Sequence, residues 1–188
     1  MVYDAKAAIH FLRANAEKYR LDAERFSGWG PSSGGWLMSM AGVTKENPAF
    51  EDLSMGNGQV SSALQAVVDW CGPCGDFLNM DTAFLASHAG AADHNAADSP
   101  ESRFLGARTT HISELSRMAC PCTYASADTP PFMIVHGGVD QVMPVSQSGS
   151  IVSFMKRHPM PRIGSTLRRT SCVTGILGIM NLGSSTWV

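Results

Sequence analysis

Two short, predominantly apolar runs constrain the fold of this chain more than any other feature. One covers residues 64–70 (LQAVVDW) and the other residues 131–136 (PFMIVH). Apolar runs of this length between turn residues are typical of strands buried inside a sheet. Segments with helical spacing of apolar residues lie around them, and strands that alternate with helices indicate an α/β fold. We therefore expect a three-layer αβα arrangement around a mostly parallel sheet.

The other elements follow from apolar periodicity and turn residues. Asp4 is a candidate N-cap, and apolar residues then recur at intervals of three and four as far as Tyr19, which predicts a helix. From His158 onward the periodicity fails. The remaining predicted elements are a weak strand over 25–29, a helix over 36–41, a loop over 43–60, and helices over 111–119 and 146–157.

Bulk properties exclude several classes of protein. The chain has 188 residues, enough for one domain, and a net charge of −2, which gives no electrostatic reason for binding nucleic acid or an anionic membrane. The apolar segment 174–182 is too short and too rich in glycine to span a bilayer. Residues 1–6 (MVYDAK) do not resemble an export signal, so we expect the chain as given to be cytoplasmic. Its five cysteines do not look like a secreted disulfide framework.

The segment Gly30-Pro31-Ser32-Ser33-Gly34 has the Gly-x-Ser-x-Gly pattern, between a predicted strand and a predicted helix. A nucleophilic serine needs a tight, strained turn that projects its hydroxyl while backbone N–H groups face the oxyanion of the substrate. The pattern alone fits an ordinary Gly/Ser loop equally well, but the strand–turn–helix context favours the catalytic interpretation. Pro31 is unusual here, because it fixes φ directly before the serine.

The second candidate is Asp140, in the loop after the predicted strand 131–136. A hydrolase of this type carries its triad carboxylate on a loop after a late strand, downstream of the serine. A turn aspartate that caps the next helix is the alternative. The segment His136-Gly137-Gly138 is not an oxyanion-hole motif, because such a motif precedes the nucleophile.

Four blocks of the sequence, in this order, resemble the bacterial serine esterases of the α/β-hydrolase fold, in the branch of acetyl-xylan and feruloyl esterase-like proteins. The resemblance extends from about Asp4 to Lys156. Several separate blocks in the right order are more specific than any one motif. The blocks are AIHFLRANAEKYRLDAERFSGWGPSSGG, VSSALQAVVDW, HNAADSPESRFLGA and TYASADTPPFMIVHGGVDQVMPVSQS.

The resemblance implies a partial α/β-hydrolase fold over residues 1–157, with a cap-like insertion at about 71–119. It implies hydrolysis of a carboxylic ester, such as an acetyl or hydroxycinnamoyl ester of a carbohydrate. Ser32 would be the nucleophile, Asp140 the triad acid, and the backbone N–H of Ser33 one oxyanion donor. We expect no cofactor and no metal, a small-molecule or carbohydrate ester as substrate, and no nucleic-acid or membrane partner; the oligomeric state is left open.

The chain also departs from this family. The family opens with strands that carry a His-Gly-Gly-type oxyanion loop, and they do not precede the first helix here. Its catalytic histidine follows the acid in a Gly-x-Gly-His-like turn, whereas the only histidine after Asp140 is His158, which comes too early. His136 is interpreted as a structural residue at a strand end. The triad histidine is therefore not assigned, and four histidines are interpreted as surface residues: His10, His88, His94 and His111.

Two other functions stay open from the residues alone. Trp70-Cys71-Gly72-Pro73-Cys74 resembles a thioredoxin-type redox site, which makes a thiol–disulfide oxidoreductase the rival interpretation. A reactive thiol needs a lowered pKa, for example at a helix N-terminus, and Gly75-Asp76 is a poor start for a helix. A non-catalytic hydrolase-like fragment is the other alternative. A zinc site built from Cys71, Cys74, Cys120 and Cys122 ranks below the redox interpretation.

Residues 158–188 form an atypical tail, for which we hypothesise a frameshifted translation of an esterase gene. The resemblance stops near Lys156, inside a predicted helix, and the catalytic histidine is missing. Codon degeneracy permits residues 173–183 to encode, in a shifted frame, a Gly-His turn followed by Pro and an acidic residue. The hypothesis predicts that a sheet edge is left unpaired, so that the chain is marginally stable.

Overall fold

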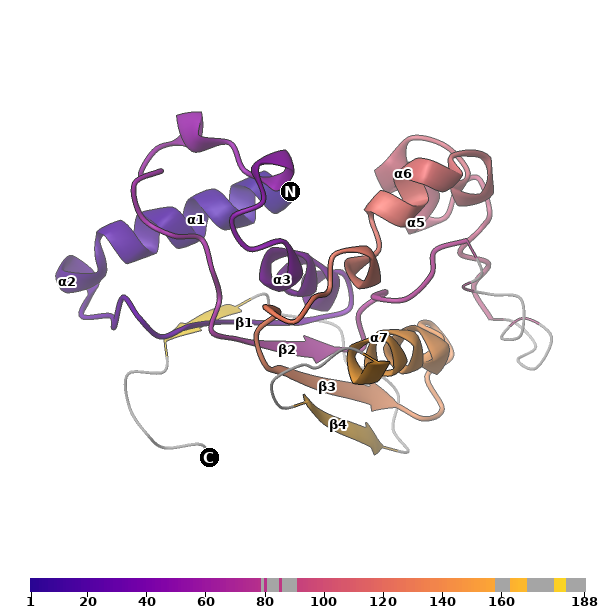
Figure 1. The fold of residues 1–188 in the computed structure, drawn as a ribbon. Helices are drawn as coiled ribbons and strands as arrows, with labels where there is room; N and C mark the ends of the chain where they lie inside the picture. The colour runs from indigo at the N-terminus through magenta and orange to yellow at the C-terminus, as the bar shows by residue number, and fades with distance from the viewer. Residues whose placement is uncertain (79, 81–84, 86–90, 158–162, 169–177, 182–188) are drawn as a thin grey trace.

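A five-stranded, mostly parallel sheet organises the chain (Figure 1). The computed structural model describes residues 1–78, 80, 85, 91–157, 163–168 and 178–181. The strand order is β4-β3-β2-β1-β5; β1 to β4 run parallel, and β5 is antiparallel to β1. The expected α/β class and mostly parallel sheet are therefore confirmed. The strands are β1 (Phe26–Pro31), β2 (Ala66–Trp70), β3 (Phe132–Gly137), β4 (Ile163–Arg168) and β5 (Gly178–Asn181).

The register of the parallel strands gathers three chain segments at one edge of the sheet. Pro31 at the end of β1 lies opposite Trp70 at the end of β2, and Trp70 lies opposite Val135 near the end of β3. The carboxyl ends of β1, β2 and β3 therefore meet at the same edge, where ligand sites of open α/β sheets lie. The segments that leave this edge begin at Ser32, Cys71 and Gly138.

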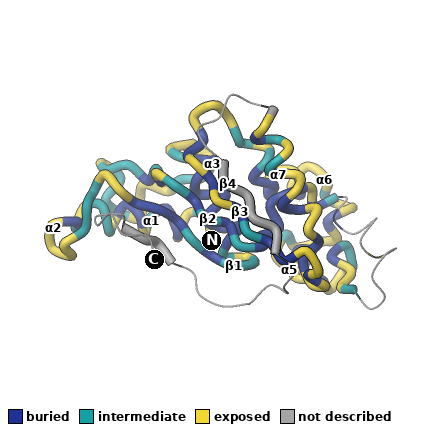
Figure 2. The backbone as a smooth tube through the Cα atoms, turned by 90° about the horizontal axis from the view of Figure 1, so that it is seen from below, coloured by how far each residue is buried: buried dark blue, intermediate teal, exposed yellow. Residues whose placement is uncertain are grey.

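Two helices, α3 (Ser33–Thr44) and α7 (Val145–Arg157), pack on one face of the sheet, and α1 (Val2–Ala14) packs against α3 on the same side (Figure 1). The α3 helix lies against β1 and β2 and is buried along most of its length. Its sequence, SGGWLMSMAGVT, is apolar on all sides, as expected for a helix inside a core. Figure 2 shows the contrast between buried α3 and the largely exposed α2 (Ala16–Tyr19) at one end of the molecule.

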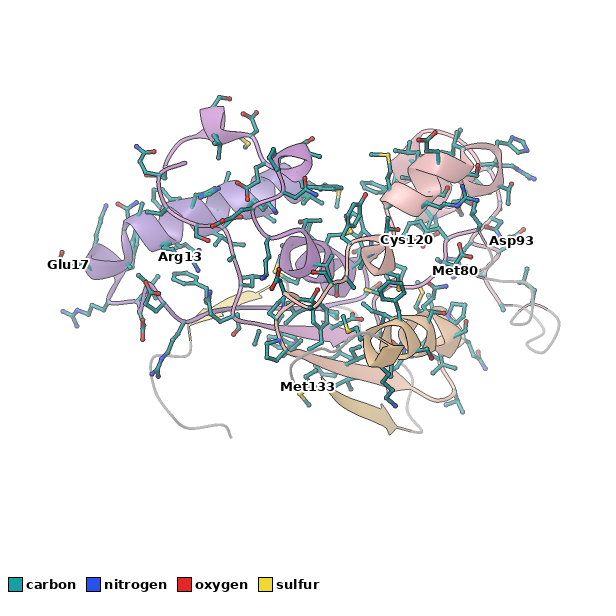
Figure 3. All side chains as sticks on the ribbon, in the orientation of Figure 1. Arg13, Glu17, Met80, Asp93, Cys120 and Met133 are labelled. Carbon is teal, nitrogen blue, oxygen red and sulfur yellow. The ribbon has the colours of Figure 1, made fainter. Side chains whose placement is uncertain are left out.

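Alternation along β3 distinguishes the two faces of the sheet. Phe132 and Ile134 are each 2% exposed and face the helices, whereas Met133 is 45% exposed. Figure 3 shows the Met133 side chain pointing away from α3 and α7. The hydrophobic core therefore lies on the helix-covered face, since successive side chains of a strand point to opposite faces.

The first predicted helix differs in detail. It begins at Val2, so Asp4 is not its N-cap; Asp4 lies in the first turn, where a carboxylate is favoured by the helix dipole. The helix breaks at Asn15 and resumes as α2. The segment 43–60 contains two 3₁₀ turns, Pro48–Phe50 and Leu53–Met55. The segment 71–122 carries α5 (Pro100–Leu105), α6 (Ser113–Met118) and 3₁₀ turns at Thr109–His111 and Pro121–Thr123.

The tail contributes two strands, so the expectation of an unpaired sheet edge was wrong for its described residues. β4 pairs with β3 in parallel, and β5 pairs with β1 in antiparallel orientation. Ladder hydrogen bonds join main-chain groups, and they form without the alternating side-chain pattern from which strands are predicted.

Candidate active site

Ser32 occupies a strained turn between β1 and α3. Its backbone has φ 52° and ψ −127°, a combination that a residue with a β-carbon rarely adopts. Two backbone hydrogen bonds hold the turn: Ser32 N–H donates to Trp70 O over 2.8 Å, and Ser32 O accepts from Trp36 N–H over 3.1 Å. The turn that connects β1 to α3 is thus hydrogen-bonded both to the end of β2 and to the first turn of α3, and Ser32 stays partly exposed.

The glycines of the motif allow this close approach. An ideal β-carbon on Gly30 would lie 2.4 Å from the carbonyl carbon of Gly34, which would force strand and helix apart. Pro31 does not disturb the turn, because it ends β1 in register with Trp70 and the elbow follows directly. The segment 30–34 therefore has the strand–turn–helix geometry that the Gly-x-Ser-x-Gly pattern predicts.

The backbone N–H of Ser33 opens α3. The first N–H groups of a helix have no partner within the helix, and they carry the positive end of its dipole. Ser33 follows Ser32 directly, so its N–H belongs to the same turn as the candidate nucleophile. It is therefore suited to stabilise a negatively charged oxygen beside Ser32.

Asp140 lies in the loop after β3 and is only 4% exposed. Its Oδ1 accepts hydrogen bonds from Val142 N–H over 2.9 Å and from Met143 N–H over 3.0 Å. Its Oδ2 is buried, and no group in the described part of the chain forms a hydrogen bond with it. One carboxylate oxygen is thus fixed by the loop, and the other remains available for a further donor.

His136 packs beside this carboxylate in a structural role, as expected from its position at a strand end. Its Nε2 lies 3.0 Å from Met143 O, and its Nδ1 lies 2.7 Å from Ser148 Oγ. Because a carbonyl only accepts, Nε2 carries the proton and Nδ1 accepts from the hydroxyl. Burial lowers the pKa of His136, which favours this neutral form. Its Nε2 is 3.9 Å from Asp140 Oδ2, beyond hydrogen-bonding distance.

Two histidines that were predicted to lie on the surface are buried. His10 is 3% exposed and contacts Val60 O over 2.6 Å, and His94 is 4% exposed and contacts Glu101 and Val142. The predictions for His10 and His94 were wrong because the residues that enclose them are brought close only by folding. Val60 and Val142 are remote in sequence, and nothing in the sequence marks Glu101 as a partner of His94. His111 is exposed, as expected. His88 and His158 lie outside the described residues.

Cys71 and Cys74 have neither the mutual disulfide nor the lowered thiol pKa that a thioredoxin-type redox site requires. Cys71 is disulfide-bonded, but not to Cys74, whose thiol is free. Burial, followed by the charge of Asp69, raises the pKa of the Cys74 thiol well above its usual range, so the nucleophilic thiolate is disfavoured. The oxidoreductase interpretation is therefore not favoured.

The other two thiols of the postulated zinc site also have structural partners. Cys120 Sγ donates to Ser116 O over 3.1 Å, and Cys122 Sγ donates to Cys74 O over 3.2 Å. Among the described residues, no three His, Cys, Asp or Glu side chains are grouped in a way that could hold a metal ion. Within the same part of the chain, no helix is long and apolar enough to cross a membrane.

A cavity of about 210 Å³ begins at the amino end of α3. Its walls are mostly apolar, and Trp36 and Phe104 meet in it edge to face at 5.1 Å between ring centroids. A larger cavity of about 310 Å³, lined by Cys120, Arg117 and Phe154 among others, does not include Ser33 in its lining, and the Asp140 loop lines neither cavity. The smaller cavity is therefore the candidate for binding substrate. Its lining includes Ser33, Trp36, Pro73, Phe77, Glu101 and Phe104.

A parallel sheet that presents a serine elbow and a buried carboxylate at one edge defines an α/β-hydrolase. A family model for BD-FAE matches residues 1–155, and the chain belongs to this family. Among curated proteins, it is 28% identical over 178 residues to the probable carboxylic ester hydrolase LipM of Mycobacterium tuberculosis and 28% identical over 165 residues to esterase LipC of the same organism. These matches cover 94% and 87% of this chain, which spans 38% of the length of each relative.

Solved structures support the same fold. A bifunctional GH43-CE protein of Bacteroides eggerthii superposes with a TM-score of 0.75 at 30% identity, covering 91% of this chain and 23% of that chain. A truncated carbohydrate esterase from gut microbiota superposes with a TM-score of 0.73 at 27% identity, covering 90% of this chain and 58% of that chain. Butyrate-bound Est2 of Thermogutta terrifontis, at 19% identity and a TM-score of 0.63, shows the fold alone; 91% of this chain and 55% of that chain are covered.

Proposed function

We propose that this chain carries the nucleophile and the acid of a serine hydrolase that cleaves carboxylic esters. The observation that carries the proposal is the strained turn at Ser32, held between Trp70 O and the first turn of α3. Strain of this kind persists only where the surrounding structure enforces it, and it is characteristic of a nucleophile elbow. The family membership and the two mycobacterial esterases support the same reaction.

In the proposed reaction, the Ser32 hydroxyl oxygen attacks the ester carbonyl carbon while a histidine base accepts its proton. The Ser33 N–H stabilises the oxyanion. The tetrahedral intermediate expels the alcohol, which takes the proton from the histidine, and water then releases the acid by the same steps. Asp140 Oδ2 would accept the hydrogen bond that orients the histidine. The histidine itself is not assigned to a described residue.

The proposed substrates are acetyl or hydroxycinnamoyl esters of carbohydrates. The cavity beside Ser33 supports a compact or aromatic acyl group, because Trp36, Phe77 and Phe104 contribute to its wall. The two carbohydrate-related neighbours, GH43-CE and the gut carbohydrate esterase, support a sugar on the alcohol side. Without a triad histidine in place, turnover would fall by roughly 10⁴-fold or more, so we expect weak activity.

A fluorophosphonate probe tests the assignment, because it phosphonylates an activated serine covalently. We expect slow labelling of the wild type with one adduct, mapped by mass spectrometry to Ser32, and no labelling of Ser32→Ala. Ser33→Ala is the matched control, since the proposed oxyanion donor is a backbone group that this substitution retains. An adduct on another residue, or equal labelling of Ser32→Ala, would show that the assignment is wrong.

A further inference from the structure

A buried histidine–glutamate pair lies between the candidate cavity and the Asp140 loop. His94 Nδ1 is 3.0 Å from Glu101 Oε2, and the two side chains are 4% and 9% exposed. Glu101 also belongs to the wall of the cavity that contains Ser33. No step of the proposed reaction uses either side chain.

The other ring nitrogen of His94 reaches the loop of the candidate acid. His94 Nε2 lies 2.6 Å from Val142 O. Because a carbonyl only accepts, Nε2 carries a proton, and one further proton is shared between Nδ1 and the carboxylate of Glu101. Through Nε2 the pair therefore donates one fixed N–H to the loop.

Val142 is held through its main chain rather than through packing. Its side chain is 64% exposed, its N–H donates to Asp140 Oδ1, and its C=O accepts from His94. A residue with little apolar packing depends on such hydrogen bonds for its position. The contact with His94 thus restrains the residue that fixes one oxygen of Asp140.

The pair itself is firmly placed. Ser99 caps α5 by accepting from Ser102 N–H over 3.1 Å, and its hydroxyl donates to His94 O over 2.7 Å. Glu101 lies in the first turn of this helix. Ser99 therefore links the backbone of His94 to the first turn of α5, which carries Glu101, and so holds the two residues in a fixed relative position.

We propose that His94 and Glu101 are positioning residues that hold the Asp140 loop, so that Asp140 Oδ2 keeps a fixed place at the edge of the sheet. The role as a triad support rests on the proposed function, whereas the restraint on the loop does not. Neither residue acts as the base, because both ring nitrogens of His94 are already engaged.

Hydrogen–deuterium exchange followed by mass spectrometry tests the restraint. In His94→Ala, we expect the amides of Val142 and Met143 to exchange about tenfold faster, because the hydrogen bond to the loop is lost. In Glu101→Ala, the effect should be similar. In Glu101→Gln, exchange should stay within about threefold of the wild type, since the glutamine amide can donate to Nδ1 and leave Nε2–H for Val142. Exposed His111→Ala is the matched control and should leave the loop unchanged.

The outcomes separate the proposal from its alternatives. Faster exchange confined to residues 93–106 would show that the pair only fastens its own segment, and would overturn the proposal. Uniformly faster exchange, including β2, would also overturn it, because the pair would then support the whole fold. Failure of the Glu101→Gln rescue would contradict the geometry. Fluorophosphonate labelling of Ser32 is scored separately, so loss of the proposed function would leave the exchange result intact.

Discussion

The carboxylate of Asp69 fills the space where a side chain at Gly35 would stand: an ideal β-carbon on Gly35 would lie 2.3 Å from Asp69 Oδ1 and 2.8 Å from Gly30 O. The same oxygen accepts a hydrogen bond from Gly72 N–H over 2.9 Å. A buried acid on β2 therefore underlies the elbow that carries Ser32.

Gly35→Ala should destabilise the protein by about 1–3 kcal/mol, because the new methyl group overlaps a buried carboxylate and a backbone oxygen. Urea denaturation measures this change. Gly149→Ala in α7 is the matched control: no atom lies within 4 Å of its ideal β-carbon, and replacing a helical glycine should stabilise by about 0.5–1 kcal/mol. Equal effects of the two substitutions would contradict the close packing at Gly35.

Asp69 should make stability depend on pH. Burial raises the pKa of its carboxyl from 3.8 to about 6, with smaller opposing effects from Cys74 and Gly72. Between these values the folded state binds more protons than the unfolded state, so the free energy of unfolding falls as pH rises. Between pH 4 and pH 7 the free energy of unfolding should fall by roughly 3 kcal/mol, since one unit of pKa shift corresponds to about 1.4 kcal/mol.

Asp69→Asn isolates this effect, because the amide cannot ionise. Urea denaturation of both proteins at intervals from pH 4 to pH 7 gives the difference in the free energy of unfolding. We expect the wild type to lose stability relative to the variant across this interval. Parallel pH profiles would mean that Asp69 does not titrate differently in the folded state.

Neighbouring positions of β3 should respond differently to truncation. Ile134→Ala should cost about 2–4 kcal/mol, because Ile134 is 2% exposed and its removal leaves a cavity in the core. Met133→Ala should cost less than about 1 kcal/mol, because Met133 is 45% exposed on the opposite face. Thermal unfolding of the two variants compares them directly, and a larger loss for Met133→Ala would show that its face is covered.

Glu51 should be essential to a buried ionic cluster beneath α1. It lies 3.2 Å from Lys6 Nζ and 3.5 Å from His10 Nε2, and it accepts from the Ser62 hydroxyl. Glu51→Ala would leave the Lys6 charge buried without its carboxylate, at a cost of about 3–5 kcal/mol. Replacing both partners, as Lys6→Met with Glu51→Leu, should recover most of the loss in urea denaturation. A double variant no more stable than Glu51→Ala would contradict this account.

The frameshift hypothesis for residues 158–188 predicts a specific feature of the coding DNA. A single-base insertion or deletion near codon 157 should restore a frame with a histidine-bearing turn. The family match ends at residue 155, as the hypothesis expects, whereas the LipM match covers 94% of the chain and so includes part of the tail. Sequencing the gene tests the frameshift hypothesis. If the alternative frames after codon 157 do not encode that turn, the hypothesis is wrong.

The sequence by itself determined the strands predicted at 64–70 and 131–136, the turn at Ser32, and the helices predicted at 36–41, 111–119 and 146–157. These features depend on short-range properties: apolar runs, helical spacing, and glycines at the two positions where strand and helix approach. The sequences of β4 and β5 lack an apolar run or an alternating pattern. Their main-chain hydrogen bonds to β3 and β1 do not require one, so these strands could not be predicted.

Only the tertiary structure decided the environment of the polar residues. His10 and His94 resemble surface residues in the sequence, yet Glu51, Val60, Glu101 and Val142 enclose them. In the sequence, Asp69 is one polar residue in an apolar run, and only the folded chain shows that it is fully buried against Gly35 and Gly72. The physical reason is that the cost of burying a polar group depends on partners supplied by the folded chain, often from remote segments.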